Sequence, residues 1–355
     1  MTIAEVAGSV EGRAAWFTAP RTIELRHEVV PPPGPGEVLV RLRATAICTL
    51  EQRIWRGVVP MYPVSPGHEP AGEVVAIGEG VVSAAPGDHV VVSFLPRCWQ
   101  CHYCRIGESD KCSTRPSRAA DEPVRFGGFA EHAIAQAYGV FRVDPTLDWA
   151  AASIAEPLAC VVHSVKSADL GFGEDVVVVG AGTMGQLHVL LASRRGCRVL
   201  VSEPDPAKRA IALEHGAAAA YDPARVDVPS VIRDETDGRG ADAIFVTAGG
   251  DAGRELLPAL RRGGRAIFYT AYYPPVEWPL EPDWVHGSQV RLIGSVNQTQ
   301  ADWLDAARLL SKRIVDVSHL VSARVGLDEL PKAMERATTD GAFRVVVEMA
   351  GGTGG

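Results

Sequence analysis

The sequence predicts an α/β protein divided into a β-rich domain and a doubly wound domain with a parallel sheet. Its 355 residues exceed the length at which one hydrophobic core keeps growing, so two domains are expected. The part before Ala150 has many glycines and prolines between short apolar runs, a pattern typical of strands separated by turns. From Ala150 onward strand-like and helix-like segments alternate, which predicts a parallel sheet covered by helices.

Each part contributes its own predicted elements. In the β-rich part we expect strands at residues 37–42, 72–77 and 88–92. In the second part we expect strands at 176–179, 198–201, 243–246, 265–268 and 290–293, and helices at 205–215 and 252–260. Two amphipathic helices are expected at 301–310 and 327–337, and a last strand at 344–348.

Composition and charge exclude several classes of protein. Hydrophobic residues make up 46% and charged residues 22% of the chain, which is ordinary globular usage. A net charge of -8 gives no electrostatic footprint for nucleic acid or for a membrane surface. The first residues lack the basic start and apolar run of a secretory signal. We therefore expect a cytoplasmic protein that acts on a small molecule, without a nucleic-acid or membrane partner.

A glycine-rich turn predicts a dinucleotide site. Four consecutive valines, residues 176–179, lead into Gly180-Ala181-Gly182-Thr183-Met184-Gly185, and an apolar-periodic helix follows. The first glycine of this motif permits a tight turn, the second lets the backbone approach a pyrophosphate, and the third allows helix and strand to pack closely. The helix N-terminus then offers free N–H groups to the phosphates.

The acidic residue Glu203 ends the next predicted strand. A carboxylate there accepts hydrogen bonds from the adenosine ribose and repels a 2′-phosphate, which favours NAD. Lys208 and Arg209 lie nearby, so NADP is the less favoured alternative.

Four of the seven cysteines crowd into one segment. They follow the spacing C-x2-C-x2-C-x7-C at Cys98, Cys101, Cys104 and Cys112. Four soft ligands at this spacing fit a closed, tetrahedral, structural zinc site, and an iron–sulfur cluster or an oxidised loop are the alternatives. A second, dispersed set of metal ligands consists of Cys48, His68, Glu69 and Glu156. Together these side chains predict an open site with mixed sulfur, nitrogen and oxygen ligands.

In the order of these motifs the chain resembles the zinc-dependent medium-chain dehydrogenase/reductase family, and within it the polyol (sorbitol) and threonine dehydrogenase-like branch. The resemblance extends from about residue 14 to residue 349, and it rests on Gly67-His68-Glu69, the four cysteines, Glu156-Pro157-Leu158 and the glycine motif. It implies a GroES-like catalytic domain at residues 1–153, a Rossmann NAD-binding domain at 154–293, and a return segment at 294–355 that completes the catalytic domain. It also implies a homodimer or homotetramer.

The resemblance also implies roles for single residues. Cys48 and His68 would be catalytic zinc ligands, Glu156 would stand where alcohol dehydrogenases have a cysteine, and Glu69 would hold the zinc-bound water or exchange with it as a ligand. The metal would acidify the substrate hydroxyl while a hydride moves to the nicotinamide. Residues expected beside the coenzyme are Thr247, Ser295 and, at the pyrophosphate, Arg344.

The chain departs from the family pattern after Cys48. Relatives carry a hydroxyl two residues beyond this cysteine, which passes the alcohol proton outward, and here Leu50 occupies that position. Glu51 replaces the usual aspartate and Arg53 replaces a histidine that is often present. Three alternatives could replace the missing hydroxyl in removing the alcohol proton. Thr49 could turn inward, zinc-bound water and Glu69 could form the relay, or the substrate could need no relay. We prefer the route through water and Glu69.

These features lead to an expected function. We expect a hydride transfer between NAD(H) and a polar secondary alcohol of the polyol, sugar or aminocyclitol type, or its ketone. The alternatives are a biosynthetic tailoring reductase that acts on an imine or conjugated carbonyl, and a catalytically silent NAD-binding homologue. The expected substrate pocket is lined by Trp55, Phe94 and Asn297, and further candidates are Tyr272, Tyr273 and Trp284.

Overall fold

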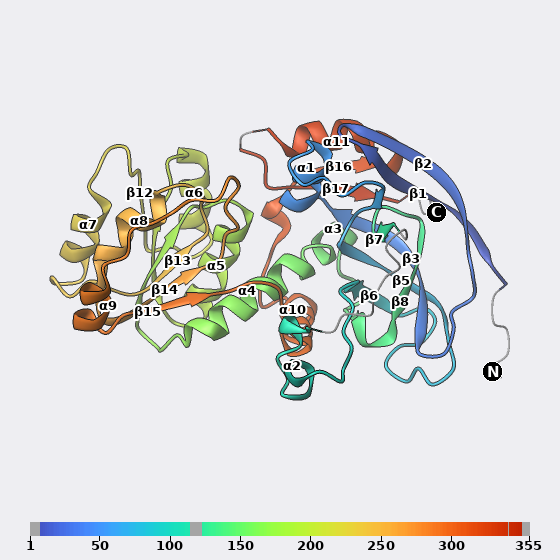
Figure 1. The fold of residues 1–355 in the computed structure, drawn as a ribbon, viewed down its shortest axis with the longest axis horizontal. Coiled ribbons are helices and arrows are strands. Elements are labelled where there is room, and N and C mark those ends of the chain that lie inside the picture. Colours follow the sequence, from blue (N-terminus) through green and yellow to red (C-terminus); the bar gives the residue numbers. More distant parts are fainter. Residues whose placement is uncertain (1–7, 114–122, 340, 350–355) are drawn as a thin grey trace. The chain divides into compact units, whose positions relative to one another are not determined.

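The computed structural model describes residues 8–113, 123–339 and 341–349 (Figure 1). It separates into two compact units. Unit 1 consists of residues 1–159 and 298–355, and unit 2 consists of residues 160–297. Unit 2 is thus inserted into the sequence of unit 1. The boundaries fall a few residues beyond the expected ones at 153 and 293.

Unit 2 is built on a six-stranded sheet in which every neighbouring pair is parallel. Its spatial order is β12 (Ala219–Tyr221), β11 (Arg198–Ser202), β10 (Asp175–Val179), β13 (Ala241–Val246), β14 (Leu260–Phe268) and β15 (Arg291–Gly294). The order reverses beside β10, which makes the carboxyl end of β10 the topological switch point where open α/β sheets bind ligands. All residues of β10 and β13 are buried, as is typical of central strands in a parallel sheet that is covered on both faces.

Helices surround this sheet (Figure 1). They are α5 (Thr183–Arg194), α6 (Pro206–Glu214), α7 (Val228–Glu235), α8 (Ala252–Leu256), the 3-10 turn η3 (Leu257–Ala259) and α9 (Pro282–Ser288). The predicted helix 252–260 was too long, because Pro258 lacks a backbone N–H and the chain tightens into η3 before β14 begins. Helix α4 (Ala155–Ala168) contains the first boundary between the units.

Unit 1 is β-rich and contains two sheets. The smaller sheet has the order β2 (Thr22–Val30), β1 (Val10–Ala19), β4 (Val64–Ser65) and β7 (Val124–Arg125). The larger sheet has the order β16 (Val321–Gly326), β17 (Arg344–Glu348), β3 (Glu37–Ala46), β5 (Glu69–Ile77), β6 (His89–Val92) and β9 (Val140–Arg142), and β8 (His132–Gln136) also pairs with β3. The expected strands 37–42, 72–77 and 88–92 all lie within or next to these elements. β17, from the end of the sequence, is hydrogen-bonded to β3.

Short helices join the strands of unit 1. They are α1 (Thr49–Trp55), α2 (His102–Arg105), η1 (Ser109–Lys111), η2 (Ala137–Gly139), α3 (Trp149–Ala152), α10 (Gln300–Ser311), η4 (Ser318–Leu320), η5 (Leu327–Glu329) and α11 (Leu330–Ala337). The core of unit 1 lies between α11 and the strands and includes Phe17, Val40, Ile54 and Met334. The mixed α/β fold with a β-rich and a parallel-sheet part is confirmed. Within the described ranges, every helix is too short or too polar to cross a membrane.

Candidate metal centre and dinucleotide site

Strand pairing in unit 1 brings Cys48, His68 and Glu69 together. Cys48 follows β3 and is the N-cap residue of α1, and Glu69 is the first residue of β5. β3 and β5 are antiparallel, with Ala46 opposite Glu69, so the end of one strand meets the start of the other. The ligand atoms of the three side chains all lie within 4.8 Å of one another. A thiol, an imidazole and a carboxylate at this separation fit the donor set and the size of a zinc site.

Glu51 lies behind His68. Its carboxylate accepts a hydrogen bond from His68 Nδ1 at 2.6 Å and further hydrogen bonds from the backbone N–H groups of Gly67 and Cys48 at 3.1 and 3.2 Å. Because the carboxylate accepts, Nδ1 carries the proton and Nε2 is the nitrogen that can bind a metal. Burial alone would lower the pKa of His68, but the Glu51 charge raises it well above its usual value. Glu51, expected among the catalytic residues, therefore acts through the imidazole.

Arg344 holds the carboxylate of Glu69. Its Nε and Nη2 donate to the two carboxylate oxygens at 3.0 and 2.7 Å, and Nη2 lies 3.7 Å from Cys48 Sγ. Both side chains are buried. Burial raises the pKa of Glu69 to about 7, against the opposing charge of Arg344. Arg344 was expected to contact the coenzyme pyrophosphate. In the structure it pairs with Glu69 instead, because β17 is hydrogen-bonded to β3 in unit 1 and places the guanidinium beside that carboxylate.

Glu156 lies outside the group of three ligands. Its Oε1 accepts a hydrogen bond from Gln298 Nε2 at 3.0 Å. Glu156 is nevertheless close enough for its charge to raise the pKa values of Glu69 and Arg344. Glu156 was expected to be a metal ligand, but in this structure it is not part of the ligand group. Gln298, which sequence reasoning passed over, follows Asn297 and gives no motif by which it could have been found.

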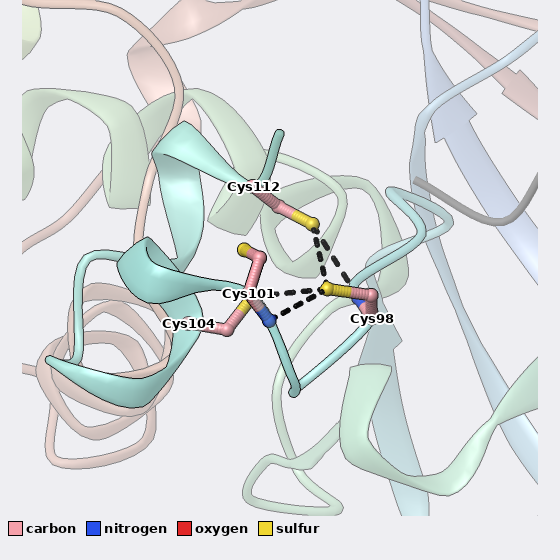
Figure 2. A group of neighbouring side chains, drawn as sticks. All are labelled: Cys98, Cys101, Cys104 and Cys112. Atoms are coloured by element: carbon pink, nitrogen blue, oxygen red, sulfur yellow. Dashed lines mark hydrogen bonds between the residues drawn. The ribbon is translucent and has the colours of Figure 1, made fainter. Parts of the chain in front are cut away.

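The four cysteines form a second group of ligands, also in unit 1 (Figure 2). Cys98 Sγ lies 3.6 Å from Cys112 Sγ and 4.0 Å from Cys104 Sγ, and the backbone N–H of Cys101 donates to Cys98 Sγ at 3.3 Å. Hydrogen bonds from the backbone of Cys104 and Ser113 lower the pKa of Cys101 to about 5, whereas burial raises the pKa of Cys104 to about 12. Four sulfurs that converge from one loop leave no open position, so the group fits a structural zinc ion.

Leu50, two residues beyond Cys48, supplies no hydroxyl. It packs against the core of unit 1, and Thr49 before it is exposed. Trp55, expected in the substrate pocket, is instead a core residue at 4% exposure, and the Arg21 guanidinium lies 5.0 Å from its ring centroid.

Aromatic side chains do line a cavity in unit 1. Phe94 and Phe126 both contribute to a cavity of about 640 Å³, and the ring of Phe126 lies 5.9 Å from that of His68. Phe94 thus lines a cavity of unit 1, and its place in the substrate pocket stays a prediction. Asn297 is half-buried in the left-handed conformation, with φ of 59°. Tyr272 lies in unit 2, where it packs edge-on against Trp278, and Tyr273 is exposed.

The glycine motif of unit 2 has the local geometry that its sequence predicts. Gly180 has a φ of 88°, and a Cβ there would lie 2.8 Å from Ala248 Cβ. A Cβ on Gly185 would overlap the carbonyl oxygen of Gly180. At Gly182, by contrast, a Cβ would meet nothing within 4 Å. Gly182 is the N-cap of α5 and has no side chain to cap the helix, so Thr183 and Met184 begin a helix whose first N–H groups can receive an anion.

Glu203 is hydrogen-bonded to the backbone of the glycine motif. Its Oε2 accepts a hydrogen bond from the Ala181 N–H at 2.6 Å, and its Oε1 accepts one from the Asp205 N–H at 2.9 Å. Arg209 donates to the carbonyls of Glu203 and Pro204 at 2.6 and 2.7 Å. Lys208 Nζ lies 4.0 Å from Asp205. The two basic residues near this carboxylate are thus engaged within unit 2.

Two further residues expected beside the coenzyme lie at strand ends of unit 2. Thr247 Oγ1 donates to the carbonyl oxygens of Val179 and Gly180 at 2.9 and 3.1 Å, which ties β13 to the glycine turn. Ser295 is buried, and its hydroxyl has no hydrogen-bond partner within the described part of the chain. An orphaned hydroxyl just after β15 remains available for a ligand group.

Two family models match the chain. The alcohol dehydrogenase GroES-like domain matches residues 34–145, and the zinc-binding dehydrogenase model matches residues 183–312. The sorbitol dehydrogenase of Halalkalibacterium halodurans is 29% identical over 323 residues, which cover 89% of this chain and 93% of that protein. The L-threonine 3-dehydrogenase of Caldanaerobacter subterraneus subsp. tengcongensis is 31% identical over 316 residues, which cover 86% and 89%. A zinc-binding dehydrogenase of Sinorhizobium meliloti 1021, solved with NADP, superposes with a TM-score of 0.86 at 28% identity over 96% of this chain and 99% of that chain.

Proposed function

Since the chain belongs to the zinc-dependent medium-chain dehydrogenase/reductase family, in its polyol and threonine dehydrogenase-like branch, we propose that it transfers a hydride between NAD(H) and a polar secondary alcohol or its ketone. The alcohol is of the polyol, sugar or aminocyclitol type. The observation that carries this proposal is the convergence of Cys48, His68 and Glu69, whose ligand atoms all lie within 4.8 Å of one another. The chain is an alcohol dehydrogenase-like oxidoreductase, as its family implies.

The protein's own residues supply the metal site. Cys48, His68 and Glu69 would hold a zinc ion, with Glu51 fixing the imidazole and Arg344 fixing the carboxylate. When bound, zinc supplies Lewis acidity toward the substrate oxygen. The four cysteines of the lobe, Cys98 to Cys112, would hold a second, structural zinc ion.

We propose that Glu69 would receive the proton of the substrate hydroxyl in the state in which it has exchanged off the metal position, since a carboxylate bound there could not act as the base. The usual relay position holds Leu50, which packs against the core and carries no exchangeable proton. Glu69 is the acid that lies in the ligand group itself. In Glu69→Gln the pH profile of turnover should lose its acidic limb, and a profile equal to that of the wild type would rule this route out.

NAD is the proposed coenzyme. Glu203 stands where the adenosine ribose hydroxyls would be read, and its charge would repel a 2′-phosphate. Lys208 and Arg209, which would otherwise attract that phosphate, are engaged by Asp205 and by backbone carbonyls. The Sinorhizobium relative was solved with NADP, so the two coenzymes should be compared directly. We expect kcat/KM for NAD to exceed that for NADP, and Glu203→Ala to reduce the ratio.

The packing of Leu50 favours a second candidate function. A reductase that tailors an imine or conjugated carbonyl does not need to remove an alcohol proton, so it can dispense with the hydroxyl. Polyols, aminocyclitols and sugars should be screened with NAD, and ketones and imines with NADH, while nicotinamide absorbance is followed. Brisk alcohol oxidation by the unmodified protein supports the first function, whereas robust reduction with no alcohol oxidation, even in Leu50→Thr, supports the second.

Assembly and location follow the same family. We propose a homo-oligomer, supported by the edge strand β15 of the unit 2 sheet, in which Arg291, Leu292 and Gly294 are exposed. We also propose a reducing, cytoplasmic compartment, supported by the free thiols of all seven cysteines. Sedimentation of the purified protein tests the first proposal.

A further inference from the structure

The amide of Gln298 contacts the carboxylate that stays outside the ligand group. Gln298 is buried at 1% exposure, and its Nε2 donates to Glu156 Oε1 at 3.0 Å. Glu156 is close enough to Glu69 for its charge to raise the pKa of that residue, yet it is not part of the group formed by Cys48, His68 and Glu69. Two carboxylates therefore lie near the same candidate metal position, and only one of them belongs to the ligand group.

The two carboxylates have different partners. Glu69 is bound through both oxygens by the Arg344 guanidinium, and Glu156 is bound by the neutral amide of Gln298. A divalent cation beside Cys48 and His68 would attract either carboxylate by Coulomb's law. What keeps Glu156 in its outer place must therefore be its surroundings, and these include the hydrogen bond from the Gln298 amide.

Gln298 is itself held rigidly. Asn297, immediately before it, has a φ of 59°, and a capping box starts immediately after it, in which Thr299 Oγ1 contacts Asp302 at 2.7 Å and opens α10. The carbonyl oxygen of Gln298 accepts a hydrogen bond from Arg97 Nη2 at 3.3 Å. Arg97 is buried and directly precedes Cys98, the first cysteine of the lobe. The backbone on each side thus fixes where the Gln298 amide points.

We propose that Gln298 is a positioning residue that retains Glu156 outside the metal ligand group and so keeps one metal position open for substrate. This inference rests on the proposed function, because an open position has a use only if a substrate oxygen occupies it. The Gln298 amide is suited to this role because a neutral hydrogen bond orients the Glu156 carboxylate without neutralising its charge, as an arginine would.

The test is the absorption spectrum of the cobalt-substituted protein, because Co2+ reports the number and type of its ligands. In Gln298→Leu, Glu156 is released and joins the metal, so the spectrum of this site should change and transfer of the ion to a chelator should slow by about tenfold. In the double variant Gln298→Leu with Glu156→Gln the spectrum and the transfer rate should return to those of the wild type. Glu156→Gln alone should leave the spectrum unchanged.

A matched control exists in the same unit. Gln136 Nε2 donates to Glu37 Oε1 at 3.1 Å on the exposed side of β8, so Gln136→Leu removes the same kind of pair away from the metal. His68→Ala supplies the spectrum of the cysteine lobe alone, which is subtracted. An unchanged spectrum in Gln298→Leu, or a change that Glu156→Gln fails to reverse, overturns the inference. A wild-type protein that binds metal only in the cysteine lobe overturns the proposed function together with it.

Discussion

The carboxylate of Glu51 and the imidazole of His68 form a buried pair in which Glu51 Oε1 lies 2.6 Å from His68 Nδ1. The pair fixes the tautomer of His68 and turns Nε2 toward Cys48 and Glu69. Two backbone N–H groups, those of Gly67 and Cys48, also hold the Glu51 carboxylate in place. The metal site thus depends on a residue that does not itself bind the metal.

Removal of this carboxylate should weaken the metal site. Glu51→Gln loses the negative charge that orients His68, so the affinity of the site for zinc should fall by about 10- to 100-fold. Competition with a chromophoric chelator measures this affinity. The cysteine lobe, which Glu51 does not touch, should keep its zinc and serves as the internal reference.

Two alanine substitutions in the glycine motif should affect different properties, one NADH binding and the other thermal stability. At Gly182 an added Cβ meets nothing within 4 Å, so Gly182→Ala should leave the melting temperature unchanged while the methyl group blocks the pyrophosphate and weakens NADH binding by at least about tenfold. At Gly185 the Cβ would overlap the Gly180 carbonyl, so Gly185→Ala should lower the melting temperature. Thermal unfolding and NADH fluorescence titration separate the two effects. Equal NADH affinity in Gly182→Ala and the wild type would refute the assigned site.

His188 should make unit 2 sensitive to acid. Its Nδ1 lies 2.7 Å from the Met184 carbonyl and its Nε2 lies 2.9 Å from Ser164 Oγ, and burial lowers the pKa of His188 to about 4. Between pH 6.5 and 4 the unfolded chain binds a proton that the folded chain does not bind. The free energy of unfolding should therefore fall as the pH drops through this window, by roughly 3 kcal/mol in total, and the contribution is absent above pH 6.5.

Denaturant unfolding at a series of pH values measures this dependence. The matched variant is His188→Gln, which keeps a donor and an acceptor but does not titrate, so its curve should be flatter between pH 6.5 and 4. His215, the C-cap residue of α6 in unit 2, gives the comparison variant His215→Gln, which leaves His188 in place. If the two variants show the same slope, burial of His188 is not the cause.

Removal of the buried Arg344 guanidinium should lower the free energy of unfolding. Arg344→Leu leaves Glu69 buried without its partner, and breaking such a pair typically destabilises a protein by about 3–5 kcal/mol. Arg324, on the neighbouring strand β16, forms exposed pairs with Asp148 and Glu348, so Arg324→Leu should cost less than about 1 kcal/mol. Chemical denaturation of the two variants tests the difference.

The sequence was most informative where the site is local in the chain. The glycine turn follows its strand directly, and the four cysteines lie within one loop, so spacing alone defined both. The ligands Cys48, His68 and Glu69 lie at two strand ends, and their approach depends on the register of β3 and β5. The sequence does not show this register, so the prediction of these ligands depended on the family resemblance. The predicted strands and most helices are also confirmed, because apolar periodicity is likewise local.

The residues that support the site could not be found in this way. Arg344 and Glu69 are separated by 275 positions, and Gln298 and Glu156 by 142, so neither pair leaves a pattern in one sequence. Trp55 was placed in the substrate pocket because aromatic side chains often line such pockets, but burial in the core competes for the same residue type. Tertiary packing decides between the two outcomes.

The central claim is that Cys48, His68 and Glu69 hold a zinc ion separate from that of the cysteine lobe. Metal analysis of the purified wild type and of His68→Ala tests it most directly. The account predicts two zinc ions per wild-type chain and one in His68→Ala, with dinucleotide-dependent hydride transfer lost in the variant and its fold retained. One zinc ion in both proteins, or the same hydride transfer in both, would contradict it.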